Sequence, residues 1–195
     1  DKCIAIQKKL FSAECEKELL NLVESIFEEL IPLDYSGLYI YNSKTQNLDL
    51  KLAHGFSEEE RLIAEKTAMD RHPGKVFKTG TQIYVPDTEN DPDNNTVDSP
   101  RTFNVRTRLY QPILVKGKCI GVFGVVSKRP DAFSDLQKKL FEFVCKVFGK
   151  ARLNLLQVLE IKEANKELER LSLLATHTDN AVIITDKSGK IEWVN

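Results

Sequence analysis

The chain has 195 residues, of which 42% are hydrophobic and 29% are charged, and its formal net charge is -1. A near-neutral balance gives no electrostatic case for nucleic acid or an anionic membrane as a partner, and no apolar run is long enough to cross a bilayer. We therefore expect a cytoplasmic globular protein without nucleic-acid or membrane contact. Because the sequence ends within a strand-like alternation at Trp193-Val194-Asn195, we also expect it to be a piece of a longer protein.

The first part of the chain predicts one helix followed by a β-hairpin. Residues 2–31 show a helical apolar pattern, which Pro32 ends because proline cannot continue a helix. Residues 35–41 and 48–53 alternate apolar and polar side chains with a period of two, and a polar loop separates them. Such alternation indicates two antiparallel strands.

Two short helices and a brief strand are expected next. Ser57 and Glu60 have the spacing of a capping box, which predicts the start of the first helix. Pro73 suits the first turn of the second helix and Gly80 suits its C-cap. Residues 82–85 then form the strand.

The segment 87–104 is polar and rich in turn residues. A loop of this length inside a compact domain is usually a lid over a site or a disordered segment. Two long strands follow at 107–115 and 119–127. Antiparallel strands between flanking helices predict an α+β fold, with helices on the faces of one sheet.

A long helix is expected from Phe133 to about Leu174, because this stretch has no proline and its only glycine is Gly149. At 1.5 Å per residue it would be roughly 60 Å long, which exceeds the width of a small domain. Near its start the apolar stripe is broad, as expected for packing on a domain. Beyond residue 151 the charged residues leave only a narrow heptad seam.

This seam predicts how two chains could pair. Its members follow a three-four spacing: Val144, Val147, Ala151, Asn154, Val158, Ile161, Asn165, Leu168 and Ser172. Asparagine in a seam costs stability but can fix register and favour two strands. We expect residues 151–174 to form a helical coiled-coil linker that makes a parallel homodimer, and the alternative of one long surface helix stays open.

The four cysteines and three histidines give little sign of chemistry. Cys3, Cys15, Cys119 and Cys145 are scattered without a C-x-x-C spacing, which favours buried, reduced thiols over a metal site. The histidines lie far apart, and no nucleophile with its base, phosphate loop or carboxylate pair can be assembled from spacing. We therefore expect no catalytic residue, no metal ligand and no enzymatic activity in this fragment.

Two stretches resemble the GAF family in one consistent order. The first is Pro73-Gly-Lys-Val-Phe-Lys-Thr-Gly-Thr-Gln-Ile-Tyr-Val-Pro-Asp87, a short helix ending in Thr-Gly before a strand ending in Pro-Asp. The second is Arg108-Leu-Tyr-Gln-Pro-Ile-Leu-Val-Lys-Gly-Lys-Cys-Ile-Gly-Val-Phe-Gly-Val126, followed by Phe133-Ser-Asp135. The resemblance implies a GAF-like sensory domain over residues 1–150.

The resemblance also implies a small-molecule pocket between one face of the sheet and the lid at residues 87–106. The residues expected around it are Tyr39, Tyr41, Val76, Phe77, Phe103, Arg106 and Phe123. Aromatic walls with a few polar groups suit a ligand pocket, and they suit an ordinary core equally well. The ligand and any cofactor stay unknown, because the residue set typical of cyclic-nucleotide binding is incomplete and the lid contains no cysteine for a bilin.

The end of the chain, from Leu174, resembles the opening of a PAS domain: a lead-in, a strand, an Asp-x-x-Gly turn and a strand ending in Val-Asn. We expect residues 175–195 to be the N-terminal fragment of such a domain. Two strands without the rest of their sheet cannot bury their own apolar side chains.

Together these features imply a sensory or regulatory module of a signal-transduction protein, as in two-component sensor histidine kinases or diguanylate cyclases. Such a module would pass a signal through the dimeric helix to the PAS domain and then to an output domain. Two alternatives stay open. One is a dimerisation module that binds no ligand, and the other is a thiol redox sensor or enzyme that uses Cys119.

Overall fold

The computed structural model describes residues 2–31, 33–90, 105–176 and 183–194. It divides into two compact units, Asp1–Leu155 and Leu156–Asn195. Among the described residues, no helix combines the length and hydrophobicity that crossing a bilayer requires.

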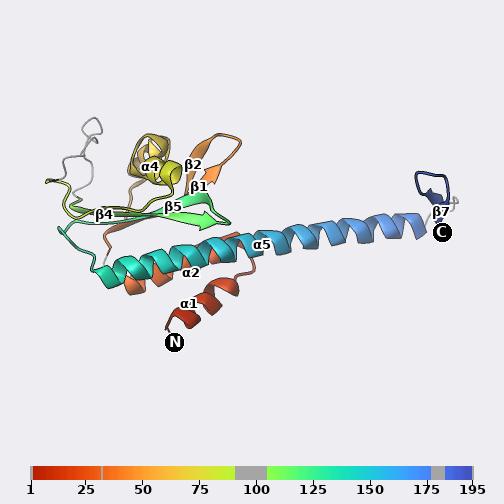
Figure 1. Cartoon of the computed structure of the whole chain (residues 1–195), viewed down its shortest axis with the longest axis horizontal. Coiled ribbons are helices and arrows are strands. Elements are labelled where there is room, and N and C mark those ends of the chain that lie inside the picture. Colours follow the sequence, from red (N-terminus) through yellow and green to blue (C-terminus); the bar gives the residue numbers. More distant parts are fainter. Residues whose placement is uncertain (1, 32, 91–104, 177–182, 195) are drawn as a thin grey trace. The chain divides into compact units, whose positions relative to one another are not determined.

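The first unit contains a five-stranded antiparallel sheet with the strand order β2-β1-β5-β4-β3. Its strands are β1 (Tyr35–Asn42), β2 (Asn47–His54), β3 (Ile83–Val85), β4 (Thr107–Val115) and β5 (Lys118–Ser127). Helices cover both faces (Figure 1). The predicted α+β fold, an antiparallel sheet flanked by helices, is therefore confirmed.

The N-terminal helix expected over residues 2–31 is two helices, α1 (Lys2–Phe11) and α2 (Glu16–Leu30). The prediction of one helix was wrong because the chain turns between them. The Ser12 hydroxyl donates to the carbonyl of Lys9, and the backbone N–H of Glu14 donates to the Glu18 carboxylate. Both helices bury apolar side chains in the same core. The apolar pattern of the sequence therefore does not show where the first helix ends and the second begins.

One face of the sheet packs against α2 and the first part of α5 (Asp135–Thr176), as Figure 1 shows. Three rings form the centre of this core. Phe27 of α2 lies 4.5 Å from Phe123 of β5 and 4.9 Å from Phe141 of α5, between ring centroids. All three side chains are almost fully buried, and burying a side chain of this size contributes about 1.5–3 kcal/mol.

The opposite face is covered by α3 (Glu58–Lys66), the 3-10 turn η1 (Ala68–Asp70) and α4 (His72–Thr79). The capping box predicted at the start of α3 is present, since Ser57 and Glu60 exchange hydrogen bonds of 2.7 and 3.2 Å. Gly80 ends α4 in the left-handed conformation, with a φ of 65°, which suits glycine because it has no Cβ.

Helix α5 has 42 residues, close to the length predicted. Up to Leu155 it belongs to the first unit, where its apolar stripe packs on the domain as predicted. Val144, Val147 and Ala151 are buried in the domain core, so they pack within their own chain. Only the later seam positions, from Asn154 onward, are exposed.

The second unit holds residues 156–176 of α5 and a hairpin of β6 (Ile183–Thr185) and β7 (Ile191–Val194). The expected Asp-x-x-Gly turn is present. The Asp186 carboxylate accepts hydrogen bonds from the backbone N–H groups of Ser188 and Lys190, at 2.8 and 3.0 Å. Ile184 and Ile191 remain about half exposed. That the hairpin opens a PAS domain stays a prediction.

The cysteines differ from the expectation of four buried thiols. Cys145 is buried and Cys119 is partly buried, but Cys3 and Cys15 are exposed. The prediction was wrong for the two N-terminal cysteines: Cys3 lies on the outer side of α1, and Cys15 lies in the turn before α2.

Candidate ligand-binding site

The candidate site lies on the sheet face that α3, η1 and α4 cover. Side chains alternate between the two faces of a strand. On β1, Leu38 and Ile40 therefore enter the helical core, whereas Tyr39 points to the other face. On β4, Leu109 enters the core and Tyr110 lines the opposite face.

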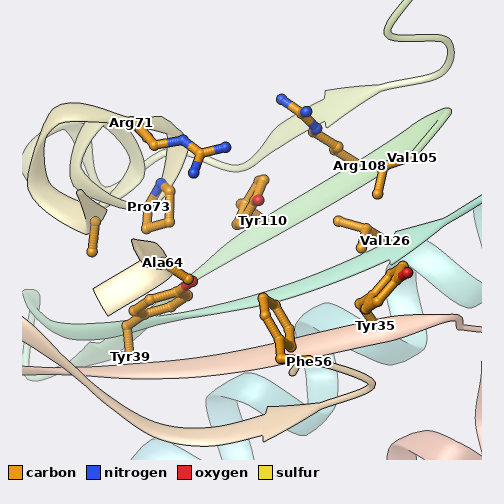
Figure 2. Close-up of a pocket in the computed structure, with 11 residues that line it drawn as sticks. Tyr35, Tyr39, Phe56, Ala64, Arg71, Pro73, Val105, Arg108, Tyr110 and Val126 are labelled. Atoms are coloured by element: carbon orange, nitrogen blue, oxygen red, sulfur yellow. The ribbon is translucent and has the colours of Figure 1, made fainter. Parts of the chain in front are cut away.

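A cavity of about 50 Å³ lies between these layers (Figure 2). Since a cavity needs about 10–15 Å³ to hold one water molecule, this cavity has room for a few waters or a small ligand group. Its lining combines aromatic, small apolar and cationic side chains. The lining residues are Tyr35, Tyr39, Phe56, Ala64, Ala68, Arg71, Pro73, Val105, Arg108, Tyr110 and Val126.

Two glycines lie beside this site, on neighbouring strands of the sheet. Gly124 of β5 is paired with both Gly37 of β1 and Tyr110 of β4. A Cβ on Gly124 would lie only 2.4 Å from Cε1 of Tyr110, so the absence of a side chain lets the Tyr110 ring lie across β5. Both glycines border a smaller hollow that shares several walls with the main cavity.

Small side chains bring the covering helices close to the sheet. Ala64 of α3 and Ala68 of η1 are buried in one cluster with Tyr39. The turn into α4 is also tight, because a Cβ on Gly74 would lie 2.0 Å from the carbonyl oxygen of Met69. This close approach places Arg71 and Pro73 at the edge of the cavity.

Two guanidinium groups give the site its polarity. Figure 2 shows Arg71 and Arg108 reaching the cavity from different segments, with Tyr110 between them. Arg108 is only 9% exposed, and Arg71 donates a long hydrogen bond of 3.5 Å to the hydroxyl of Thr67. Guanidinium groups bind carboxylates and phosphates in fork geometry, so the site could hold a small molecule with an acidic group.

The buried tyrosine hydroxyl is kept neutral. Burial raises the pKa of Tyr39 far above its ordinary value, and the nearby Tyr110 adds to the rise, whereas Arg71 opposes it. A neutral phenol both donates and accepts a hydrogen bond. Tyr39 therefore offers the cavity a polar contact without a charge.

Of the seven residues predicted around the pocket, the structure brings Tyr39 to the lining of this cavity. Tyr41 and Phe77 lie in the same apolar cluster as Tyr39, where their rings stack at 4.5 Å. Val76 of α4 is fully buried and does not belong to the lining. Phe103 lies outside the described residues.

The other two predicted residues lie elsewhere. Phe123 belongs to the helical core on the opposite face of the sheet, because it alternates with Gly124 along β5. Arg106 donates two hydrogen bonds of 2.8 Å to the Asp87 carboxylate. Arg106 lowers the pKa of Asp87 well below its ordinary value. This pair joins the two described segments that flank residues 91–104 and takes no part in the lining.

Sequence reasoning missed Tyr35, Phe56, Arg71, Arg108 and Tyr110. Strand parity could have found part of this set. Tyr35 shares its face with Tyr39, and Arg108 shares its face with Tyr110, since each pair is separated by an even number of residues. Nothing in the local pattern signals Arg71, which reaches the cavity through the turn between η1 and α4.

Neither thiol in the sheet and last helix is activated. Burial raises the pKa of Cys119, and burial raises the pKa of Cys145 still more strongly. Reactive cysteines require the opposite shift, toward the thiolate. This observation weighs against a thiol mechanism at Cys119.

The family model of the GAF domain matches residues 16–151. The chain therefore belongs to the GAF family. GAF domains are sensory and regulatory modules of signalling proteins.

A curated relative, described as a probable 3',5'-cyclic phosphodiesterase pde-5 of Caenorhabditis elegans, is 25% identical over 184 residues. The match covers 89% of this chain and 25% of the relative. The chain thus spans about a quarter of the length of that protein.

Solved structures share the fold at low sequence identity. A domain of a two-component sensor histidine kinase from Sinorhizobium meliloti is 14% identical, with a TM-score of 0.58 over 79% of this chain and 99% of that chain. The free methionine-R-sulfoxide reductase of Neisseria meningitidis is 18% identical, with a TM-score of 0.60 over 81% of this chain and 94% of that chain. Likeness at this level establishes the fold alone.

Proposed function

We propose that this GAF domain is the ligand-sensing part of a signal-transduction protein and that it binds a small molecule in the cavity under Tyr110. The observation that carries the proposal is the lining itself. Aromatic rings, two guanidinium groups and a neutral phenol converge on one cavity on the sheet face opposite the main core. A concave, mostly apolar site with a few convergent polar groups is typical of small-molecule binding.

Strand β4 supplies a route from the cavity to α5. Its alternate residues Arg108 and Tyr110 line the cavity, whereas Leu109 and Ile113 are buried in the core that contains α5. Gly149 of α5 approaches β4 so closely that a Cβ would lie 2.9 Å from Cγ2 of Ile113. A ligand that binds more tightly to one position of β4 would therefore shift the position of α5. The size of this shift in population is limited by the difference between the ligand's affinities for the two positions.

We further propose that α5 carries the signal as a parallel homodimer. Val158, Ile161 and Leu168 keep the seam spacing and are 39%, 60% and 64% exposed. Asn154 precedes Val158 in the seam and Asn165 lies between Ile161 and Leu168, and the two asparagines would fix the register. The hairpin at residues 183–194, with its half-exposed isoleucines, fits the start of a PAS domain that would pass the signal to a histidine kinase or diguanylate cyclase in the cytoplasm.

The test is native mass spectrometry of freshly purified chain, which reports bound small molecules and subunit number together. A cavity-filling variant, Ala64→Leu, places three more carbon atoms beside Tyr39, and Leu62→Ala on the exposed side of α3 is its control. We expect a bound molecule in the parent and in the control but not in Ala64→Leu.

Two results would redirect the proposal. A dimer without any bound molecule, from several expression hosts, would favour a pure dimerisation module. A bound molecule that survives Ala64→Leu would place the ligand outside this cavity. Because overpacking a core costs about 1–3 kcal/mol, thermal unfolding of each variant must first show that the domain is folded.

A further inference from the structure

Three side chains with metal-ligand atoms meet at the edge of the sheet, on the face opposite the candidate pocket. Glu24 and Glu28 lie one turn apart on α2 and so share a helix face. His54 is the last residue of the edge strand β2. Its Nδ1 lies 3.1 Å from Oε1 of Glu28 and 3.8 Å from Oε1 of Glu24, and the three ligand atoms all lie within 4.8 Å of one another.

The backbone on each side of this cluster is firmly held. His54 is paired with Ser36 across the β1–β2 ladder. The next residue, Gly55, has a φ of 80°, and a Cβ there would lie 2.4 Å from the carbonyl oxygen of Asp34, so the chain must turn immediately after His54. On α2 the adjacent residues Val23 and Phe27 are buried. Ligands on rigid elements are more exactly placed than ligands on loops.

In the part of the chain that the structure describes, the two carboxylates pair with His54 and with no lysine or arginine. The imidazole nitrogen and the two carboxylates make a donor set of one nitrogen and two oxygens. That set suits zinc and related first-row ions, whereas calcium and magnesium prefer oxygen ligands throughout.

We propose that Glu24, Glu28 and His54 bind one divalent transition-metal ion, with Zn²⁺ as the expected occupant. Zinc bonds of about 2.0–2.1 Å in a tetrahedral site place neighbouring ligand atoms about 3.3 Å apart, so the observed separations of 3.1 and 3.8 Å need only small side-chain rotations. The three side chains are 29% to 47% exposed, which leaves an entry path and a fourth position for water. A bound ion would join α2 to β2 and stabilise the domain.

The test is calorimetric titration of metal-free protein with ZnCl₂. Because the exposed thiols of Cys3 and Cys15 would bind zinc themselves, the full chain is used with both replaced by serine. We expect one Zn²⁺ per chain and a higher unfolding temperature with zinc, since an ion that binds only the folded state stabilises it. His54→Ala and Glu28→Gln should each weaken zinc binding at least about tenfold. Losing a residue that only hydrogen-bonds to a metal ligand already weakens binding about 10–100-fold, and these residues are proposed as ligands themselves.

The matched control is Glu29→Gln, which removes the same charge one position along α2, where the side chain pairs with Lys2 at 3.3 Å. It should leave zinc affinity unchanged. MgCl₂ and CaCl₂ at the same concentrations should give no binding heat. The proposal is overturned if the parent binds no zinc, if His54→Ala binds it as tightly as the parent, or if Ca²⁺ binds as tightly as Zn²⁺.

Discussion

Replacing Gly124 by alanine should distort the candidate pocket without touching the main core. The new Cβ would lie 2.4 Å from Cε1 and 2.6 Å from Cδ1 of Tyr110, whereas ordinary contacts begin at 3.4 Å, so the ring must move by about 1 Å. Neither Gly124 nor Gly37 has a positive φ, and the cost is therefore steric. Overpacking of this kind typically costs about 1–3 kcal/mol.

Urea unfolding and thermal unfolding measure this cost. For a chain of this size, 1 kcal/mol corresponds to about 2–4 °C in Tm. Gly37→Ala is the matched control on the neighbouring strand, because its Cβ would lie 3.1 Å from the edge of the Tyr39 ring. Its smaller clash is partly offset by the roughly 0.5–1 kcal/mol that alanine gains over glycine within a strand.

A double-mutant cycle tests the stated cause directly. In a Tyr110→Ala background the ring that clashes with the new methyl group is absent, so Gly124→Ala should cost little there. In the parent background, Gly124→Ala should also weaken the binding of any molecule found in the cavity. If Gly124→Ala destabilises the protein equally with and without the Tyr110 ring, the contact between these two residues does not explain the glycine.

Three further results are expected. Because Arg106 lowers the pKa of Asp87, the parent should be more stable than Asp87→Asn above about pH 4, near the unfolded pKa of aspartate. This stability advantage should shrink as the pH falls further. Urea unfolding across pH 2–7 measures the difference, and a difference that does not change with pH would contradict the ion pair. Replacing both Asn154 and Asn165 by valine should lower the dimer dissociation constant in sedimentation equilibrium, and an unchanged constant would count against the seam. Iodoacetamide should label the exposed thiols of native protein but spare Cys145 until the domain unfolds, as intact mass reports.

Local signals in the sequence were sufficient for most elements. The alternation of apolar residues in β1 and β2, the capping box at Ser57 and the glycine after α4 each depend on contacts between near neighbours in the chain, so they can be inferred without the fold. The break between α1 and α2 could not be inferred in this way, because both helices bury residues in one core and the apolar period runs on through the turn.

The candidate sites depend on contacts between distant residues. Strand parity alone assigns Tyr39 and Tyr110 to faces, but the pairing of Gly124 with both Gly37 and Tyr110 decides that the ring lies over β5. Phe123 precedes Gly124 on β5, so its side chain lies on the opposite face of the sheet, because successive residues of a strand alternate between the two faces.

Periodicity and the order of short motifs were enough to predict most of the helices and strands, the α+β class and the likeness to GAF domains, but not the break between α1 and α2. Only the tertiary structure decided which side chains share a cavity, and that His54 meets Glu24 across α2 and β2. The physical reason is that strand register and helix packing set these distances, and neither is encoded within a short stretch of the chain.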